Sequence, residues 1–229
     1  MTSDGSAARP RRSVLYMPGS NARALEKAKG LPADALILDL EDAVAPDAKA
    51  EARAQVCAAV HDGGYGDREI IIRVNGADTP WGDDDLKAAA VAGAEAILIP
   101  KVESAQMVQD AAAKMTAAGA PDGTNLWCMM ETPRGILQAE EIAGSNPRLK
   151  CFVMGTSDLT KDLHALHTLD RTAHLSSSPS STPGHSIVHT SHHVIAPNSV
   201  WDRGTPTIIT LQNLVGAYGA DHPSAAHVD

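Results

Sequence analysis

Two acidic residues follow two apolar runs of the chain, each close to the point where the run ends. Glu131 comes directly after the run 126–130, and Asp158 comes shortly after the run 151–154. Apolar runs that alternate with helical segments are typical of buried parallel strands, whose carboxyl ends meet at one edge of a sheet. Carboxylates crowded there repel one another, and a hard divalent cation relieves the repulsion by coordinating their oxygens. Because Mg²⁺ usually binds one or two protein carboxylates, the sequence predicts a magnesium site with Glu131 and Asp158 as its ligands.

A cation and three further acidic residues are expected at the same edge. Arg73 interrupts the apolar run 69–74, where an arginine is costly unless it is paired. We therefore expect Arg73 to bind an oxygen-rich substrate acid in bidentate fashion, which a guanidinium can do and a lysine ammonium cannot. Asp39, Glu41 and Asp42 follow the preceding strand. We expect these three to orient Arg73 or water at the metal.

The segment after Glu131 is expected to contact the substrate as well. Pro133, Arg134 and Gly135 lie at a strand-to-helix junction, and the stretch around Asp158 repeats this arrangement. Backbone N–H groups at helix N-termini bind anions. The sequence therefore predicts that Glu131, Pro133, Arg134 and Gly135 line the substrate site, with backbone amides receiving the substrate carboxylate.

Each of these roles has a structural alternative. A carboxylate after a strand is often only a helix N-cap or first-turn residue, and this reading is stronger for Asp158 than for Glu131. The three acidic residues after the second strand could equally form a solvated turn. Arg73 could make a structural ion pair, and Lys101 could simply pair with Glu103.

Six apolar strands alternate with helices along the chain. Continuous apolar strands separated by helices favour parallel pairing, because a half-exposed antiparallel sheet would show alternating polar residues. The sequence predicts an α/β fold of the TIM-type (β/α) barrel class, and an open doubly wound sheet is the alternative. About six βα units are recognisable where a closed barrel has eight, so the barrel is expected to be incomplete. The strands are expected at 13–19, 35–44, 69–76, 94–103, 125–131 and 150–159, and the helices at 21–30, 48–60, 83–92, 104–118 and 136–143.

The composition changes near residue 172. Residues 172–229 contain four Asp, Glu, Lys or Arg residues but seven histidines, and the stretch 174–186 is rich in Ser and Pro. We therefore assign 11–171 to a (β/α) barrel catalytic domain and 172–229 to an atypical low-charge tail, produced by a frame change, an aberrant splice or a divergent end. We expect 173–206 to be mostly irregular and mobile. Only the apolar run 207–219 is suited to pair or pack, and the histidines lack the ligand pattern of a zinc site.

The overall composition argues against several classes of protein. The 229 residues carry a formal net charge of −9 and a pI near 5.5, so a basic surface for nucleic acid is not expected. No apolar run approaches the ~18 residues of a membrane span, and the N-terminus lacks the apolar segment of a signal peptide. The three cysteines, Cys57, Cys128 and Cys151, are odd in number and two lie in apolar runs. This pattern favours free thiols over disulfides and a cytoplasmic protein.

Six short stretches occur in order along the chain: RSVLYMPGSN, DLEDAV, IIIRVNG, ILIPKVES, METPRGI and GTSDLTKDL. Together they resemble the citrate lyase beta subunit-like CoA-ester lyases of the HpcH/HpaI aldolase family, over roughly residues 11–171. The resemblance implies a TIM barrel that uses Mg²⁺ to cleave or form the bond between a CoA-thioester methylene and a keto acid. It also implies that Glu131 and Asp158 bind the metal and that Arg73 holds the acid part of the substrate.

The expected function follows from this resemblance. It implies a carbon–carbon lyase that acts on a malyl-, citramalyl- or citryl-CoA type of ester and releases acetyl-CoA or a related thioester and a keto acid. Relatives continue with two more strand–helix units and a C-terminal segment that covers the active site, often on a neighbouring subunit, so a homo-oligomer is expected. The alternatives are a class II pyruvate aldolase of the same superfamily and a catalytically impaired, truncated homologue that only binds metal or a partner subunit.

Overall fold

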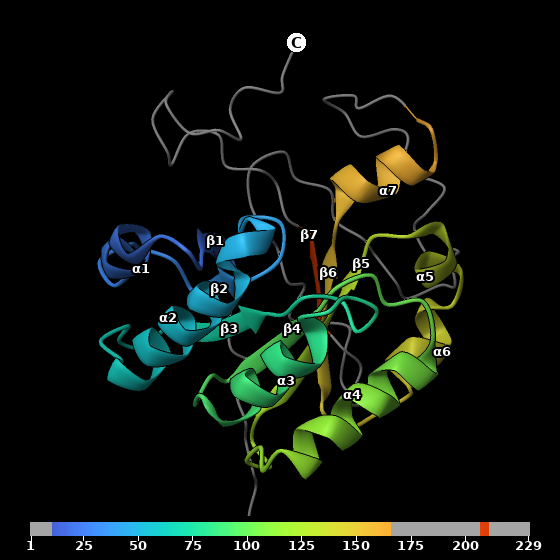
Figure 1. Ribbon diagram of the computed structural model, residues 1–229. Helices are drawn as coiled ribbons and strands as arrows, with labels where there is room; N and C mark the ends of the chain where they lie inside the picture. The colour runs from blue at the N-terminus through green and yellow to red at the C-terminus, as the bar shows by residue number, and fades with distance from the viewer. Residues whose placement is uncertain (1–10, 166–206, 211–229) are drawn as a thin grey trace, which may run out of the picture.

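The computed structural model describes residues 11–165 and 207–210, and these residues form one parallel sheet with helices (Figure 1). The seven strands pair in the order in which they occur along the chain, and every pair is parallel. The strands are β1 (Val14–Pro18), β2 (Ala35–Asp39), β3 (Glu69–Arg73), β4 (Ala96–Ile99), β5 (Asn125–Met130), β6 (Leu149–Met154) and β7 (Thr207–Thr210).

The helices begin and end close to the expected positions. Ser104 caps its helix as the sequence suggests, because its hydroxyl accepts a hydrogen bond from the Met107 N–H at 3.4 Å. Gly93, with a φ of 94°, follows the end of another helix in the left-handed region that glycine tolerates. The helices are α1 (Ala22–Ala28), the 3₁₀ helix η1 (Pro46–Ala48), α2 (Lys49–Asp62), α3 (Gly82–Val91), α4 (Ala105–Ala117), α5 (Pro133–Leu137), α6 (Ala139–Ala143) and α7 (Thr156–Asp162).

Several of the sequence-based boundaries are wrong. The strands expected to run to residues 44 and 103 end at Asp39 and Ile99. The single helix expected at 136–143 is two short helices, α5 and α6, which meet at Gln138. The first of them starts early, at Pro133, because the Thr132 hydroxyl accepts from the Gly135 N–H at 3.1 Å and proline is favoured in a first helical turn. The strand expected to run to residue 159 ends at Met154, and the remainder forms α7.

The sheet has an outer face that packs on the helices and an inner face that does not. Leu36, Leu38 and Ile72 belong to the outer apolar cluster, which also contains residues of α1–α4. Ile37 and Ile71 belong to an inner cluster built, in the described part of the chain, from strand residues alone. Side chains alternate along a strand, so a residue two positions after an inner residue also points inward. Two positions after Ile37, Ile71 and Met129 of the inner cluster lie Asp39, Arg73 and Glu131.

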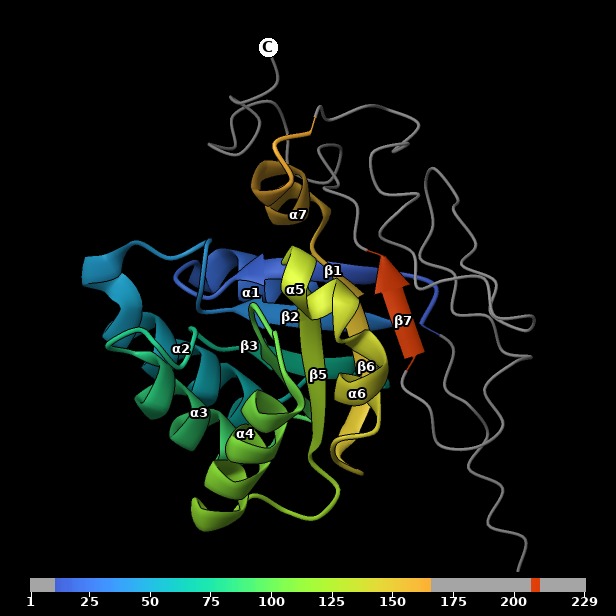
Figure 2. The same cartoon turned by 90° about the vertical axis from the view of Figure 1, so that its right-hand side faces the viewer.

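This arrangement supports the barrel prediction over the doubly wound alternative. A doubly wound sheet reverses its strand order and carries helices on both faces, whereas here the order is sequential and the sheet curves around its inner face (Figure 2). Six successive βα units are present, as predicted, and β7 falls in the apolar run that we expected to pair. Within the described residues the sheet is open between β1 and β7.

Several further expectations can be compared with the described ranges. Cys57, Cys128 and Cys151 are free, as predicted. Across 11–165 and 207–210, none of the helices has the length and apolar character needed to cross a membrane. The expected domain boundary at 171/172 and the expected mobile stretch 173–206 lie outside the described residues.

Candidate active site

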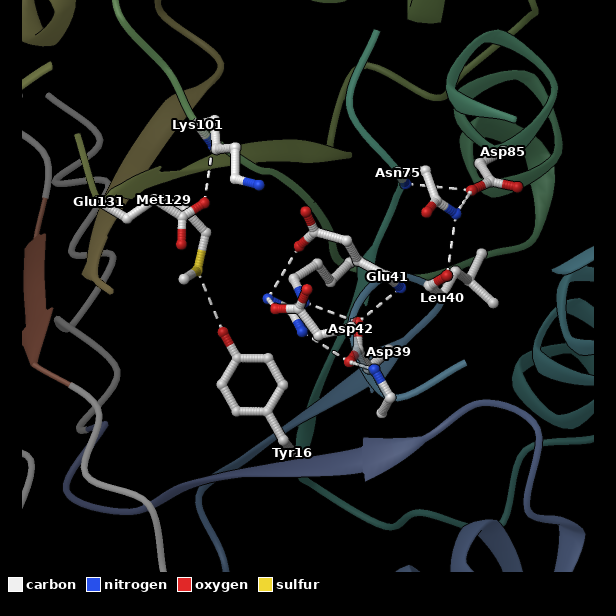
Figure 3. Close-up of polar contacts among 12 residues, drawn as sticks. Tyr16, Asp39, Leu40, Glu41, Asp42, Asn75, Asp85, Lys101, Met129 and Glu131 are labelled. Carbon is white, nitrogen blue, oxygen red and sulfur yellow. Dashed lines mark hydrogen bonds and ion pairs between the residues drawn. The ribbon is translucent and has the colours of Figure 1, made fainter. Parts of the chain in front are cut away.

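Arg73 lies at the end of β3 and is bound by Asp39 of the neighbouring strand β2. The two residues are direct register partners, and both are nearly inaccessible, with 6% and 1% of their surface exposed. Arg73 Nε donates to Asp39 Oδ1 and Nη2 donates to Oδ2, each at 2.6 Å (Figure 3). We expected this arginine to bind a substrate acid in bidentate fashion. That expectation is wrong for the Nε edge, because Asp39 already occupies it. The Nε edge of the guanidinium is therefore not free to bind a substrate.

Two more acidic residues of the β2 loop face the Nη1 side of the guanidinium. Glu41 Oε2 lies 2.9 Å from Arg73 Nη1, and Asp42 Oδ2 lies 3.2 Å from it. The Glu41 contact is an ion pair without hydrogen-bond geometry, so this buried oxygen has no hydrogen-bond partner. The solvated-turn reading of the three acidic residues holds only for Asp42, whose side chain is 66% exposed. Burial, with help from Asp42 and against the Arg73 charge, raises the pKa of Glu41 to about 7.

Glu131, directly after β5, is buried against the main chain of two neighbouring segments. Its Oε1 accepts from the Lys101 N–H at 2.9 Å. On its other side, a methyl group at Gly155 would lie 2.6 Å from Oε2, so only glycine fits there without displacing the carboxylate. Burial raises the pKa of Glu131 to about 7; the Asp158 charge adds to this effect, while the Lys101 amide and the Arg73 charge oppose it.

Asp158 lies in the first turn of α7, after β6, and is partly buried. Its charge raises the pKa values of both Glu131 and Lys101, so the three groups interact electrostatically. In the described part of the chain, no three His, Cys, Asp or Glu side chains converge as a ready-made metal site. A cation held by Glu131 and Asp158 would take its other ligands from water and substrate, which is how Mg²⁺ usually binds. Their role as metal ligands stays a prediction.

Lys101 extends its side chain into the space between Glu131 and Glu41 (Figure 3). Burial lowers the pKa of its ammonium, but the carboxylates of Glu41 and Asp158 raise it overall. Its backbone has a φ of 48°, which is uncommon for a residue other than glycine. A pair between Lys101 and Glu103, the structural alternative for these residues, is not among the ion pairs of the described residues.

The segment after Glu131 departs from the expected substrate-binding arrangement. The Gly135 N–H, which was expected to bind a substrate carboxylate, is paired with the Thr132 hydroxyl. Gly135 itself is buried, and a methyl group there would overlap with the Val102 carbonyl oxygen. Pro133 is half-buried and Arg134 is exposed. In the structure, this segment packs against the chain after β4 and caps α5. Its contact with substrate stays a prediction.

Tyr16 is a member of the site that the sequence reasoning did not identify. Its ring lies 4.9 Å from the Arg73 guanidinium, and its hydroxyl donates to the Met129 sulfur at 3.1 Å (Figure 3). Burial raises the pKa of Tyr16 well above its ordinary value, so the phenol stays protonated. The signal that could have found it is the alternation along β1, which gives Tyr16 an inward-facing position.

The sequence is similar to a malyl-CoA thioesterase and to a citrate lyase beta subunit. A (3S)-malyl-CoA thioesterase of Cereibacter sphaeroides (strain ATCC 17029 / ATH 2.4.9) is 55% identical over 166 residues, which cover 72% of this chain and 56% of that protein. Citrate lyase subunit beta of Escherichia coli (strain K12) is 40% identical over 160 residues, covering 68% of this chain and 53% of that protein. The chain thus spans about half the length of the curated relatives it matches.

Solved structures resemble the fold over a similar part of the chain. CitE of Mycobacterium tuberculosis in complex with magnesium and acetoacetate has a TM-score of 0.57 and 28% identity, and the match covers 72% of this chain and 62% of that one. Haloferax volcanii malate synthase in a magnesium/glyoxylate complex has a TM-score of 0.59 at 22% identity, covering 70% and 56% of the two chains, and it supports the fold alone. A family model matches residues 12–192, a range that includes all six βα units of the described residues. On this match, the chain belongs to the HpcH/HpaI aldolase/citrate lyase family.

Proposed function

We propose that this chain carries the metal and acid site of a Mg²⁺-dependent enzyme that cleaves a carbon–carbon bond in the CoA ester of a hydroxy acid. The observation that carries the proposal is the excess of carboxylates at the strand ends. Buried carboxyl groups from two strand ends, Glu41 and Glu131, both have a pKa near 7. Their negative charges are incompletely compensated by Arg73 and Lys101, and a divalent cation is the natural partner for such a site.

The residues fit magnesium. Glu131 and Asp158 would hold the ion, and the unsatisfied oxygen of Glu41 lies on the same inner side of the sheet. When bound, Mg²⁺ supplies a Lewis acid that polarises the oxygen destined to become the carbonyl of the keto acid. The CitE structure with magnesium and acetoacetate is consistent with this assignment in a related protein.

The protein groups supply the remaining requirements of the cleavage. When the bond between the α and β carbons breaks, its electron pair stays on the thioester fragment as an enolate, and the β-hydroxyl loses its proton. Arg73 is fixed by Asp39 and lies beside Glu41 and Asp42 at Nη1, so its positive charge is held at the strand ends without reorganisation. Glu41, buried beside this nitrogen with a pKa near 7, is suited to receive the hydroxyl proton.

Hydrolysis of the same kind of ester is the second candidate, because the relative with 55% identity is named a malyl-CoA thioesterase. The two reactions share the substrate and differ in the bond broken. Cleavage of malyl-CoA between carbons gives acetyl-CoA and glyoxylate, whereas hydrolysis of its thioester gives malate and free CoA. A pyruvate aldolase and an impaired homologue that only binds metal or a partner remain further alternatives.

A product analysis distinguishes these possibilities. Purified protein would be incubated with malyl-CoA or citramalyl-CoA, with Mg²⁺ or with EDTA, and assayed for keto acid, acetyl-CoA and free CoA. We expect Mg²⁺-dependent release of keto acid together with acetyl-CoA. Glu131→Gln should abolish this release, whereas Glu140→Gln, at an exposed position of α6, should not. Free CoA without keto acid would identify a thioesterase, and no turnover by a folded, metal-binding protein would identify an impaired homologue.

A further inference from the structure

Lys49, the first residue of α2, is a buried lysine that the proposed chemistry does not use. Only 6% of its surface is exposed. Its ammonium donates to the carbonyl oxygens of Leu40 at 2.8 Å and Glu41 at 2.6 Å, and it lies 5.4 Å from the centroid of the Trp81 ring. A buried ammonium is unfavourable unless it is hydrogen-bonded, so these contacts account for its presence in the interior.

The two carbonyl groups belong to the loop that brings acidic side chains to Arg73. On the inner side, this loop is held by Asp39, whose oxygens accept from the Glu41 N–H at 2.8 Å and the Ala43 N–H at 3.1 Å. On the opposite side, Lys49 binds the carbonyls of two consecutive residues. The loop is thus fixed from both sides of its main chain. One of these two anchors, Asp39, is itself bonded to Arg73.

The contacts of Lys49 are made to the main chain of the residue whose side chain lies beside Arg73. The carbonyls of Leu40 and Glu41 bind the ammonium, while the Glu41 carboxylate lies 2.9 Å from Arg73 Nη1. Asn75 reinforces the arrangement, since its side-chain amide donates to the Leu40 carbonyl at 2.9 Å. The Glu41 carbonyl also accepts from the Val44 N–H at 3.0 Å, and Lys49 is the one side chain that donates to it among the described residues.

We propose that Lys49 is a positioning residue of this site: by holding the main chain of 40–41 from outside the sheet, it keeps the Glu41 carboxylate in place against Arg73. The effect on turnover rests on the proposed function, whereas the effect on the loop does not. The competing reading is that Lys49 only stabilises the start of α2. The two readings differ in which part of the structure is destabilised when the ammonium is removed: the loop at residues 40–41 or the start of α2.

Hydrogen exchange tests the positioning role without any substrate. Lys49→Met keeps the length of the side chain and removes its charge and donors, and Lys27→Met makes the same change at an exposed position of α1. We expect the amides of Glu41 and Ala43 to exchange about ten- to a hundred-fold faster in Lys49→Met, because two charge-assisted hydrogen bonds are lost. Amides of β5 should keep the rates of the Lys27→Met protein. Unchanged loop amides, or a uniform acceleration across the sheet, would overturn the proposal.

Turnover provides a second readout if the CoA-ester assay succeeds. Misplacement of a catalytic group reduces the rate of the chemical step, so kcat should fall about ten- to a hundred-fold in Lys49→Met while KM changes little. Lys49→Arg, which keeps donors and charge, should restore a substantial part of kcat. A fall in kcat that Lys49→Arg does not relieve would contradict the role of the donors. If the wild-type protein turns over no CoA ester, the proposed function fails, and the exchange measurement still decides the role of Lys49.

Discussion

Gly155 offers a direct test of the metal-binding role of Glu131. Its φ of −87° needs no glycine, so a substitution there acts through space and not through backbone strain. A methyl group at this position would lie 2.5 Å from Glu131 Cβ and 2.6 Å from Glu131 Oε2. To reach the 3.4 Å at which ordinary van der Waals contact begins, the oxygen would have to retreat by about 0.8 Å.

Such a displacement is large for a magnesium ligand. Mg²⁺ demands near-ideal geometry at short distances, so we expect Gly155→Ala to weaken its binding by at least about tenfold. The overpacking should also destabilise the fold by about 1–3 kcal/mol. Titration calorimetry with Mg²⁺ measures the first effect and urea unfolding the second. Gly144→Ala is the matched control, because its methyl group would meet nothing closer than the Glu140 carbonyl at 3.9 Å. A folded Gly155→Ala protein with wild-type Mg²⁺ affinity would refute the assignment of Glu131 as a ligand.

Three further predictions concern the charged groups around this position. Arg73→Lys should reduce CoA-ester turnover by about a hundredfold in a protein that still folds, because an ammonium cannot bind both Asp39 oxygens as the planar guanidinium does. Steady-state kinetics measure the turnover and thermal melting checks the fold. Equal turnover by the two proteins would show that the arginine is structural. The pKa of Glu131 is raised in the fold, so the protonated form is favoured there: without metal, its contribution to the free energy of unfolding should be fully present below the ordinary pKa of 4.5 and should be lost as the pH rises through 7. Urea titrations at several pH values in EDTA should show this loss in the wild type and a smaller one in Glu131→Gln, and identical profiles would contradict it. Lys101→Gly should have a free energy of unfolding about 1 kcal/mol higher than Lys101→Ala, because both variants lose the ammonium but only glycine tolerates the left-handed backbone conformation; equal stabilities in the same urea assay would argue against stored strain.

The parallel sheet could be predicted from the sequence because each strand is a continuous apolar run bounded by its own helix. Ile37 and Ile71 are buried on the inner face and their neighbours on the outer face, so neither strand shows the polar alternation of a half-exposed sheet. The placement of Glu131 at a strand end followed from the same pattern. The split between α5 and α6 at Gln138 could not be predicted, since short helices depend on local capping such as that of Thr132 more than on periodicity.

The pairing within the site was harder to predict than the positions of its members. The sequence places Asp39 and Arg73 at two strand ends, but only the register of β2 against β3 makes them direct partners. Without knowledge of that register, we expected all the guanidinium donors of Arg73 to be free to bind a substrate. Lys49 was missed for a related reason: it begins a helix, where a lysine usually lies in water, and its burial depends on the loop that folds over it.

The charged groups of the site fall into two sets that can be tested apart. Asp39, Glu41 and Arg73 are joined by ion pairs and belong to β2, β3 and the loop between β2 and α2, whereas Glu131 is held by backbone contacts from Lys101 and the segment at Gly155. A lesion in the first set should remove turnover and weaken Mg²⁺ binding less than a lesion in the second, since it leaves the proposed ligands Glu131 and Asp158 in place. A lesion in the second set should remove both. If instead every substitution that abolishes turnover also abolished Mg²⁺ binding, the two sets would act as one unit, and the cation would have to lie closer to Glu41 than the strand ends alone suggest.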